Sequence, residues 1–185
     1  MKFLKWLAVI VVLGLLVRFV GMPYMQKQTK KHSPEKTSTY TKKGLDLSVN
    51  YSSPSKKGRE IFGKLVPYNL VWRTGANEPT TFTTKTDIRV IDKKLGAGTY
   101  SIWTIPNEKS WKVIFNEEVP DWGVTVLSGG KETTRDAEAD FVQVEVPVQK
   151  LQETLESFTI EFQDSDELSL TLLWDQTKVS VPLNK

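Results

Sequence analysis

Residues 158–162 read Phe-Thr-Ile-Glu-Phe, a strict alternation of apolar and polar side chains. Successive side chains of a β-strand point to opposite faces, so this alternation predicts a strand with one buried and one exposed face. The same period recurs at 142–146 (Val-Gln-Val-Glu-Val) and at 168–174 (Leu-Ser-Leu-Thr-Leu-Leu-Trp). These three segments favour an all-β domain.

Shorter segments extend this pattern toward both ends of the domain. Alternation and β-branched or aromatic residues predict further strands at 45–51, 69–72, 80–84, 88–91, 99–105, 111–115 and 178–183. Apolar residues at helical spacing predict one or two short helical turns, at 59–66 and at 148–155. About nine or ten short strands without a long helix are typical of an antiparallel β-sandwich, which we expect to span residues 44–185.

Residues 1–25 form a different kind of segment. Lys2 and Lys5 precede an uncharged apolar run from Trp6 to Val17, which Arg18 interrupts. This arrangement predicts an N-terminal transmembrane or signal helix that associates with the membrane. No Ala-x-Ala cleavage site follows, which favours an uncleaved single-pass anchor in the cell membrane. We expect the domain to be exported to a periplasmic or extracellular location, with secretion after signal cleavage as the alternative.

A polar stretch joins this helix to the domain. From Gln26 to Thr39 it contains no apolar residue and several lysines. Such a segment cannot bury enough surface to order itself, so residues 26–43 are expected to be a disordered linker.

Composition excludes several kinds of site. The chain has no cysteine, and His32, its single histidine, falls in the polar stretch. The domain therefore cannot use a Ser-His-Asp triad, a thiolate nucleophile or a zinc site built on Cys and His. We expect no metal site, no cofactor and no catalytic residue that could be named. A net charge of only +3 gives no sign of a nucleic-acid partner.

Several motifs together resemble a known family. They lie at 51–63 (Tyr-Ser-Ser-Pro-Ser-Lys-Lys-Gly-Arg-Glu-Ile-Phe-Gly), 65–68 (Leu-Val-Pro-Tyr), 71–78 (Val-Trp-Arg-Thr-Gly-Ala-Asn-Glu), 97–101, 105–106, 111–116 and 174–182. Across residues 44–182 the chain resembles the bacterial domain of unknown function 2911. The resemblance implies an exported or membrane-anchored protein, and it implies no activity, substrate or catalytic residue.

The densest group of chemically capable residues lies at 72–80, Trp-Arg-Thr-Gly-Ala-Asn-Glu-Pro-Thr. A guanidinium such as that of Arg73 can bind a carboxylate through two parallel hydrogen bonds. Gly75 is expected to adopt a φ that other residues resist, and Pro79 to hold Glu78 extended, so the loop should be rigid. The candidate ligand-binding residues are Arg59, Trp72, Arg73, Asn77, Glu78, Trp103 and Trp122.

Three functions remain open at this point. The domain could be an interaction module that binds a small molecule, a glycan or a protein near Arg73. It could be a hydrolase that pairs Glu78 with a second carboxylate. It could also be a structural domain in which Arg73 pairs internally with Glu78 or another carboxylate. We favour the hypothesis of a binding module over that of an enzyme.

Overall fold

The computed structural model describes residues 2–125, 128–130 and 132–185. The chain divides into two units, Met1–His32 and Ser33–Lys185. The first unit is a helix made of α1 (Lys2–Leu16), a π-helical turn η1 (Val17–Gly21) and α2 (Met22–His32). Its residues Lys5–His32 are long and apolar enough to cross a membrane, a property that signal sequences share. The predicted N-terminal apolar helix is confirmed.

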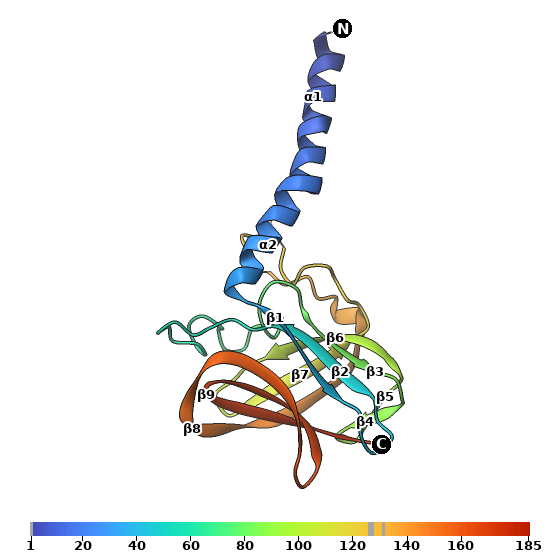
Figure 1. The fold of residues 1–185 in the computed structure, drawn as a ribbon, viewed down its shortest axis with the longest axis vertical. Coiled ribbons are helices and arrows are strands. Elements are labelled where there is room, and N and C mark those ends of the chain that lie inside the picture. The colour runs from blue at the N-terminus through green and yellow to red at the C-terminus, as the bar shows by residue number, and fades with distance from the viewer. Residues whose placement is uncertain (1, 126–127, 131) are drawn as a thin grey trace. The chain divides into compact units, whose positions relative to one another are not determined.

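The second unit is mostly β, with one antiparallel sheet of nine strands. The sheet is open and has the order β1-β2-β3-β6-β7-β8-β9-β4-β5 (Figure 1). The strands are β1 (Glu35–Tyr40), β2 (Leu47–Ser52), β3 (Thr80–Thr84), β4 (Ile88–Val90), β5 (Lys93–Leu95), β6 (Gly98–Ile105), β7 (Ser110–Asn116), β8 (Asp140–Asp164) and β9 (Leu168–Asn184), with a short 3-10 helix η2 (Ala137–Ala139) before β8.

Strands that are far apart in the sheet order meet in the core. Tyr51 of β2 packs edge-on against Phe158 of β8, with ring centroids 5.8 Å apart. Phe82 of β3 lies 6.3 Å from Phe162 of β8. The sheet therefore curls back over itself, and Figure 1 shows β8 and β9 as long, strongly curved strands that run beside each other. The alternating apolar residues of the three initial segments line this core, as predicted.

The prediction of a helical crossover at 148–155 is wrong. These residues belong to β8, which runs without a break from Asp140 to Asp164. Its pairing with β9 shifts register between Lys150 and Leu155 and again before Thr159. At each shift the regular alternation of side chains between the two faces of the strand is interrupted. The four-residue spacing of Leu151 and Leu155 therefore reflects an irregular strand rather than a helix.

The helical turns predicted at 59–66 are also absent. This segment is a series of turns closed by a β-bridge between Phe62 and Val66. Gly58 and Gly63 both adopt positive φ, at 69° and 91°, which a right-handed helix does not contain. The strand predicted at 69–72 is reduced to a single bridge between Trp72 and Thr104.

Two further segments differ from expectation. The polar stretch at 26–43 contains the end of α2 and the whole of β1, which pairs with β2 along its full length. Pairing with β2 holds most of β1, and of its side chains Tyr40 alone is buried in the core, so the spacing of apolar residues did not predict this strand. Strand β5 was not among the predicted strands; it pairs with β4 in a tight hairpin, in whose turn Ile91 takes a positive φ of 59°.

A polar contact ties β1 to the far end of β8. Asp164 accepts hydrogen bonds from the Tyr40 hydroxyl and from Lys43 Nζ, each at 2.7 Å. The bond from Lys43 first, and that from Tyr40 second, lower the pKa of Asp164 from its ordinary value. A carboxyl whose pKa is lower in the folded state stabilises that state above its unfolded pKa, and this contribution disappears as pH falls through the folded pKa.

We therefore expect the stability of Asp164→Asn to depend less on pH in the acid range than that of the native chain. Between about pH 5 and pH 2 the melting temperature of the native chain should fall more steeply than that of the variant, since only the native chain takes up this proton on unfolding. Circular dichroism melts across that range measure the two slopes. Tyr40→Phe, which removes one of the two donors, should give an intermediate slope. Equal slopes for the native chain and Asp164→Asn would contradict this role.

Candidate functional site

Trp72 fixes the start of the 72–80 loop to the sheet. Its backbone exchanges two hydrogen bonds with Thr104 of β6, at 2.7 and 2.9 Å. Its indole is 8% exposed and stacks on Trp174, with centroids 6.1 Å apart, and it also meets Phe158 at 5.1 Å. The indole N–H donates to the carbonyl of Gly75 at 3.0 Å. The loop is thus anchored by an aromatic cluster at the centre of the core.

The loop itself adopts an unusual backbone. Thr74, Gly75 and Asn77 have positive φ values of 57°, 140° and 60°. The predicted special conformation of Gly75 is confirmed, and a Cβ there would lie 2.8 Å from the carbonyl oxygen of Ser52. The hydroxyl of Thr80 donates to the carbonyl of Thr74 at 2.5 Å. Non-glycine residues persist at positive φ only where their surroundings enforce it, so this loop is rigid.

Arg73 is the residue whose environment is most unusual. Its Nε is buried and has no hydrogen-bond partner within residues 2–125, 128–130 and 132–185. Among the ion pairs of the described residues, none joins Arg73 to Glu78 or to any other carboxylate. Burial lowers the pKa of the guanidinium from its ordinary value, although arginine remains protonated. The internal Arg73–Glu78 pair that we considered is therefore not formed.

A pocket of about 380 Å³ opens beside this side chain. Most of its described lining is apolar, with Arg73 and Thr133 as the polar side chains, and Leu65 and Leu70 are 44% and 59% exposed. The described residues that line it are Leu65, Val66, Pro67, Leu70, Val71, Trp72, Arg73, Val124, Gly130 and Thr133. The described lining is thus a mostly apolar hollow with a cation in its wall, and small-molecule pockets commonly combine an apolar lining with a few polar groups.

The other predicted site residues lie elsewhere. Arg59 donates to the carbonyls of Ser55 and Lys56 in its own loop. Asn77 is buried, and its amide donates weakly to Ser52 Oγ (3.4 Å) and to the Ser33 carbonyl (3.5 Å). Trp103 has no exposed surface, and its indole N–H donates to Ser101 Oγ at 2.8 Å.

Glu78 and Trp122 are half-buried and are not among the described residues that line the pocket. Of the seven candidates, the structure brings only Trp72 and Arg73 together at the pocket. The predicted site is therefore smaller than the 72–80 motif suggested.

One residue that sequence reasoning missed is Gly123. Its backbone N–H donates to the carbonyl of Asn77 at 3.0 Å, which brings the loop after β7 against the 72–80 loop. A Cβ at this position would lie 2.4 Å from Cδ and 2.9 Å from Cβ of Arg73. Gly123 therefore holds the aliphatic part of Arg73 in place. The sequence signal was the Pro-Asp-Trp-Gly run at 120–123, which marked a tight loop without naming its partner.

Gly123→Ala should lower the free energy of unfolding by about 1–3 kcal/mol, because an inserted methyl group must displace Arg73 or the loop. Urea unfolding measures this change. Gly96→Ala is the matched control, since a Cβ there meets only two side-chain atoms, at 3.7 and 3.9 Å. Equal losses in the two variants would show that the contact between Gly123 and Arg73 is not tight.

The fold and the site together define a mostly β domain with an arginine-lined pocket, preceded by an apolar helix. The chain belongs to the family described as Protein of unknown function (DUF2911), whose model matches residues 33–183. The match begins where the second unit begins, and so it includes β1. Comparison with curated proteins and comparison with solved structures each gave no match.

Proposed function

We propose that the Ser33–Lys185 unit is a ligand-binding module that takes up a small organic carboxylate in the pocket beside Arg73. The observation that carries this proposal is the buried Nε of Arg73, which has a hydrogen to donate and no acceptor among the described residues. An unmade hydrogen bond on a buried donor costs about 1–3 kcal/mol. A ligand that supplies the acceptor removes that cost when it binds.

The geometry of the site favours a carboxylate with an apolar group attached. A guanidinium and a carboxylate match each other through two parallel hydrogen bonds, and such charge-assisted bonds are stronger than neutral ones. The apolar wall excludes water from this pair, which strengthens the attraction between the charges. The exposed leucines at positions 65 and 70 would cover the apolar part of the ligand.

The N-terminal helix would serve as the tether. We infer that it remains uncleaved as a single-pass anchor and that the domain, two packed β layers forming a sandwich, lies on the exported side of the cell membrane. Support comes from the length and composition of Lys5–His32 and from the lack of a small-residue cleavage site after it. Secretion after cleavage would leave the same binding domain free in solution.

The alternatives have less support. A hydrolase would place two carboxylates about 5–10 Å apart in a cleft. None of the described residues that line the Arg73 pocket is acidic. A purely structural role for Arg73 would call for an internal partner, and no carboxylate of the described residues forms an ion pair with it.

Isothermal titration of the detergent-solubilised full chain with hexanoate tests this proposal. We expect saturable binding of hexanoate, weaker binding of acetate and none of hexanol, because the site requires both a carboxylate and an apolar chain. Arg73→Met should remove hexanoate binding in the same detergent, which controls for partition into micelles. Equal binding of hexanol and hexanoate would contradict the role of Arg73.

A further inference from the structure

The short hairpin formed by β4 and β5 brings together two cations at a sheet edge. Arg89 of β4 lies directly opposite Lys94 of β5 in the antiparallel register. Residues in such a position have Cβ atoms about 4.5–5.5 Å apart, and like charges there are destabilising. Both side chains are exposed, and neither forms an ion pair with a described carboxylate. Arg89 Nη1 donates to the carbonyl of Asp92 at 3.0 Å, but among the described residues no ion pair offsets the repulsion between Arg89 and Lys94.

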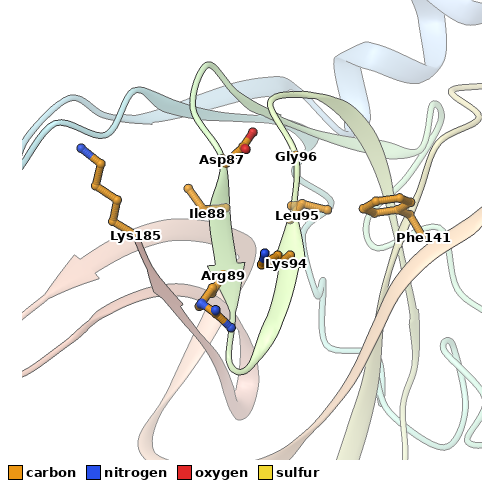
Figure 2. Close-up of a pocket in the computed structure, with 8 residues that line it drawn as sticks. All are labelled: Asp87, Ile88, Arg89, Lys94, Leu95, Gly96, Phe141 and Lys185. Atoms are coloured by element: carbon orange, nitrogen blue, oxygen red, sulfur yellow. The ribbon is translucent and has the colours of Figure 1, made fainter.

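A second pocket, also of about 380 Å³, includes this pair in its wall (Figure 2). Figure 2 shows Arg89 and Lys94 next to each other on the hairpin, with Lys185 beyond β4 and Phe141 beyond β5. One acid, Asp87, also lines the pocket, but its Oδ1 already accepts the backbone N–H of Ala97 at 2.9 Å. Three cations against one acid leave the pocket wall with an excess of positive charge.

The aromatic side of this pocket is partly open to solvent. Phe141 is 49% exposed and stacks on Tyr100, with centroids 5.9 Å apart and planes at 30°. The Tyr100 hydroxyl donates to the carbonyl of Gly96, which fixes the ring beneath Phe141. An exposed ring held in this way offers an apolar surface next to the cations. The arrangement suits a ligand with an anionic and an apolar part.

We propose that this pocket binds a phosphate monoester, with the phosphate between Arg89 and Lys94 and its organic group against Phe141. A phosphate group has several acceptor oxygens and a charge near −2 at neutral pH, so it can pair with both cations at once. Arginine supplies a fixed fork of donors to such oxygens, and lysine supplies a point charge. This site is separate from the Arg73 pocket and shares no lining residue with it.

Titration calorimetry on the detergent-solubilised full chain tests the proposal with three probes: inorganic phosphate, phenyl phosphate and dihexanoyl phosphatidate. We expect both organic phosphates to bind more tightly than inorganic phosphate, because only they reach Phe141. Tighter binding of the phosphatidate would identify a lipid headgroup as the source of the phosphate, and tighter binding of phenyl phosphate a soluble ester. Either order supports the site.

Lys94→Glu provides the decisive variant. It should weaken binding of phenyl phosphate at least tenfold, while the melting temperature without ligand stays the same or rises, since Arg89 then faces an opposite charge. Lys150→Glu changes the net charge equally on an exposed position of β8 and should leave binding within about twofold. Equal weakening by the two variants, or no phosphate binding by the native chain, would overturn the proposal.

Discussion

Trp72→Ala is expected to lower the free energy of unfolding by about 3–5 kcal/mol, the usual cost of removing a large buried aromatic side chain. The indole is 8% exposed and sits among Trp174, Phe158 and Trp111, with centroids between 5.1 and 6.1 Å away. The substitution also removes the donor to the Gly75 carbonyl and so releases the loop. Native domains have only about 5–15 kcal/mol of stability, so the variant should be marginal.

Urea unfolding followed by tryptophan fluorescence and circular dichroism measures this loss. Trp72→Phe should lower the free energy of unfolding less than Trp72→Ala does, because an aromatic ring stays in the core. It should still lower it, because the indole donor is removed. Phe141→Ala is the matched control, since it removes an aromatic ring that is 49% exposed. If Trp72→Ala lowered the free energy of unfolding no more than Phe141→Ala does, Trp72 would not be the anchor of the loop.

Arg73→Met is expected to stabilise the domain while it removes ligand binding. The methionine side chain fills a similar volume with no polar atom, so the buried donor that lacks a partner disappears. We expect a gain of about 1 kcal/mol, since burying an unpaired donor costs about 1–3 kcal/mol and the native packing is not fully reproduced. That gain corresponds to a rise in melting temperature of about 2–4 °C.

This combination of effects distinguishes a binding residue from a structural one. A structural arginine would be paired within the chain, and its removal would destabilise the domain. Arg73→Lys keeps the charge but not the planar fork of donors, so it should bind carboxylates more weakly than the native chain. It should also lack the stability gain of Arg73→Met, because a buried charge remains.

Much of the fold could be predicted from period-two alternation. The segments that contain Val142, Ile160 and Leu172 proved to be strands, because their apolar side chains face one core. The predictions failed where backbone irregularity hides that period. Register shifts in β8 imitated a helix around Leu151, and β1 is held mainly by backbone pairing, with Tyr40 as its one buried side chain. The spacing of apolar residues alone therefore predicts neither an irregular strand nor a strand with mostly polar side chains.

Two candidate residues, Trp72 and Arg73, lie at a pocket, but the rest of that pocket's lining could not be predicted. Trp72 and Arg73 were recognised because an arginine beside a turn glycine is a visible signal. The other wall of the pocket comes from distant residues such as Leu65, Leu70 and Val124, which a single sequence cannot place next to Arg73. Gly123 escaped notice for the same reason, since its importance depends on a close approach between two loops.

The most direct test of the proposed function is a hexanoate titration of the native chain and of Arg73→Met, with each melting temperature recorded at every concentration. Without hexanoate, the melting temperature of the native chain should be lower than that of Arg73→Met. It should rise as hexanoate is added and approach or exceed that of the variant, because a ligand stabilises only the protein that binds it. The melting temperature of Arg73→Met should be higher without ligand and should not change with hexanoate. A variant that starts lower than the native chain, or that responds equally to hexanoate, would contradict the assignment of Arg73 as the ligand-binding residue.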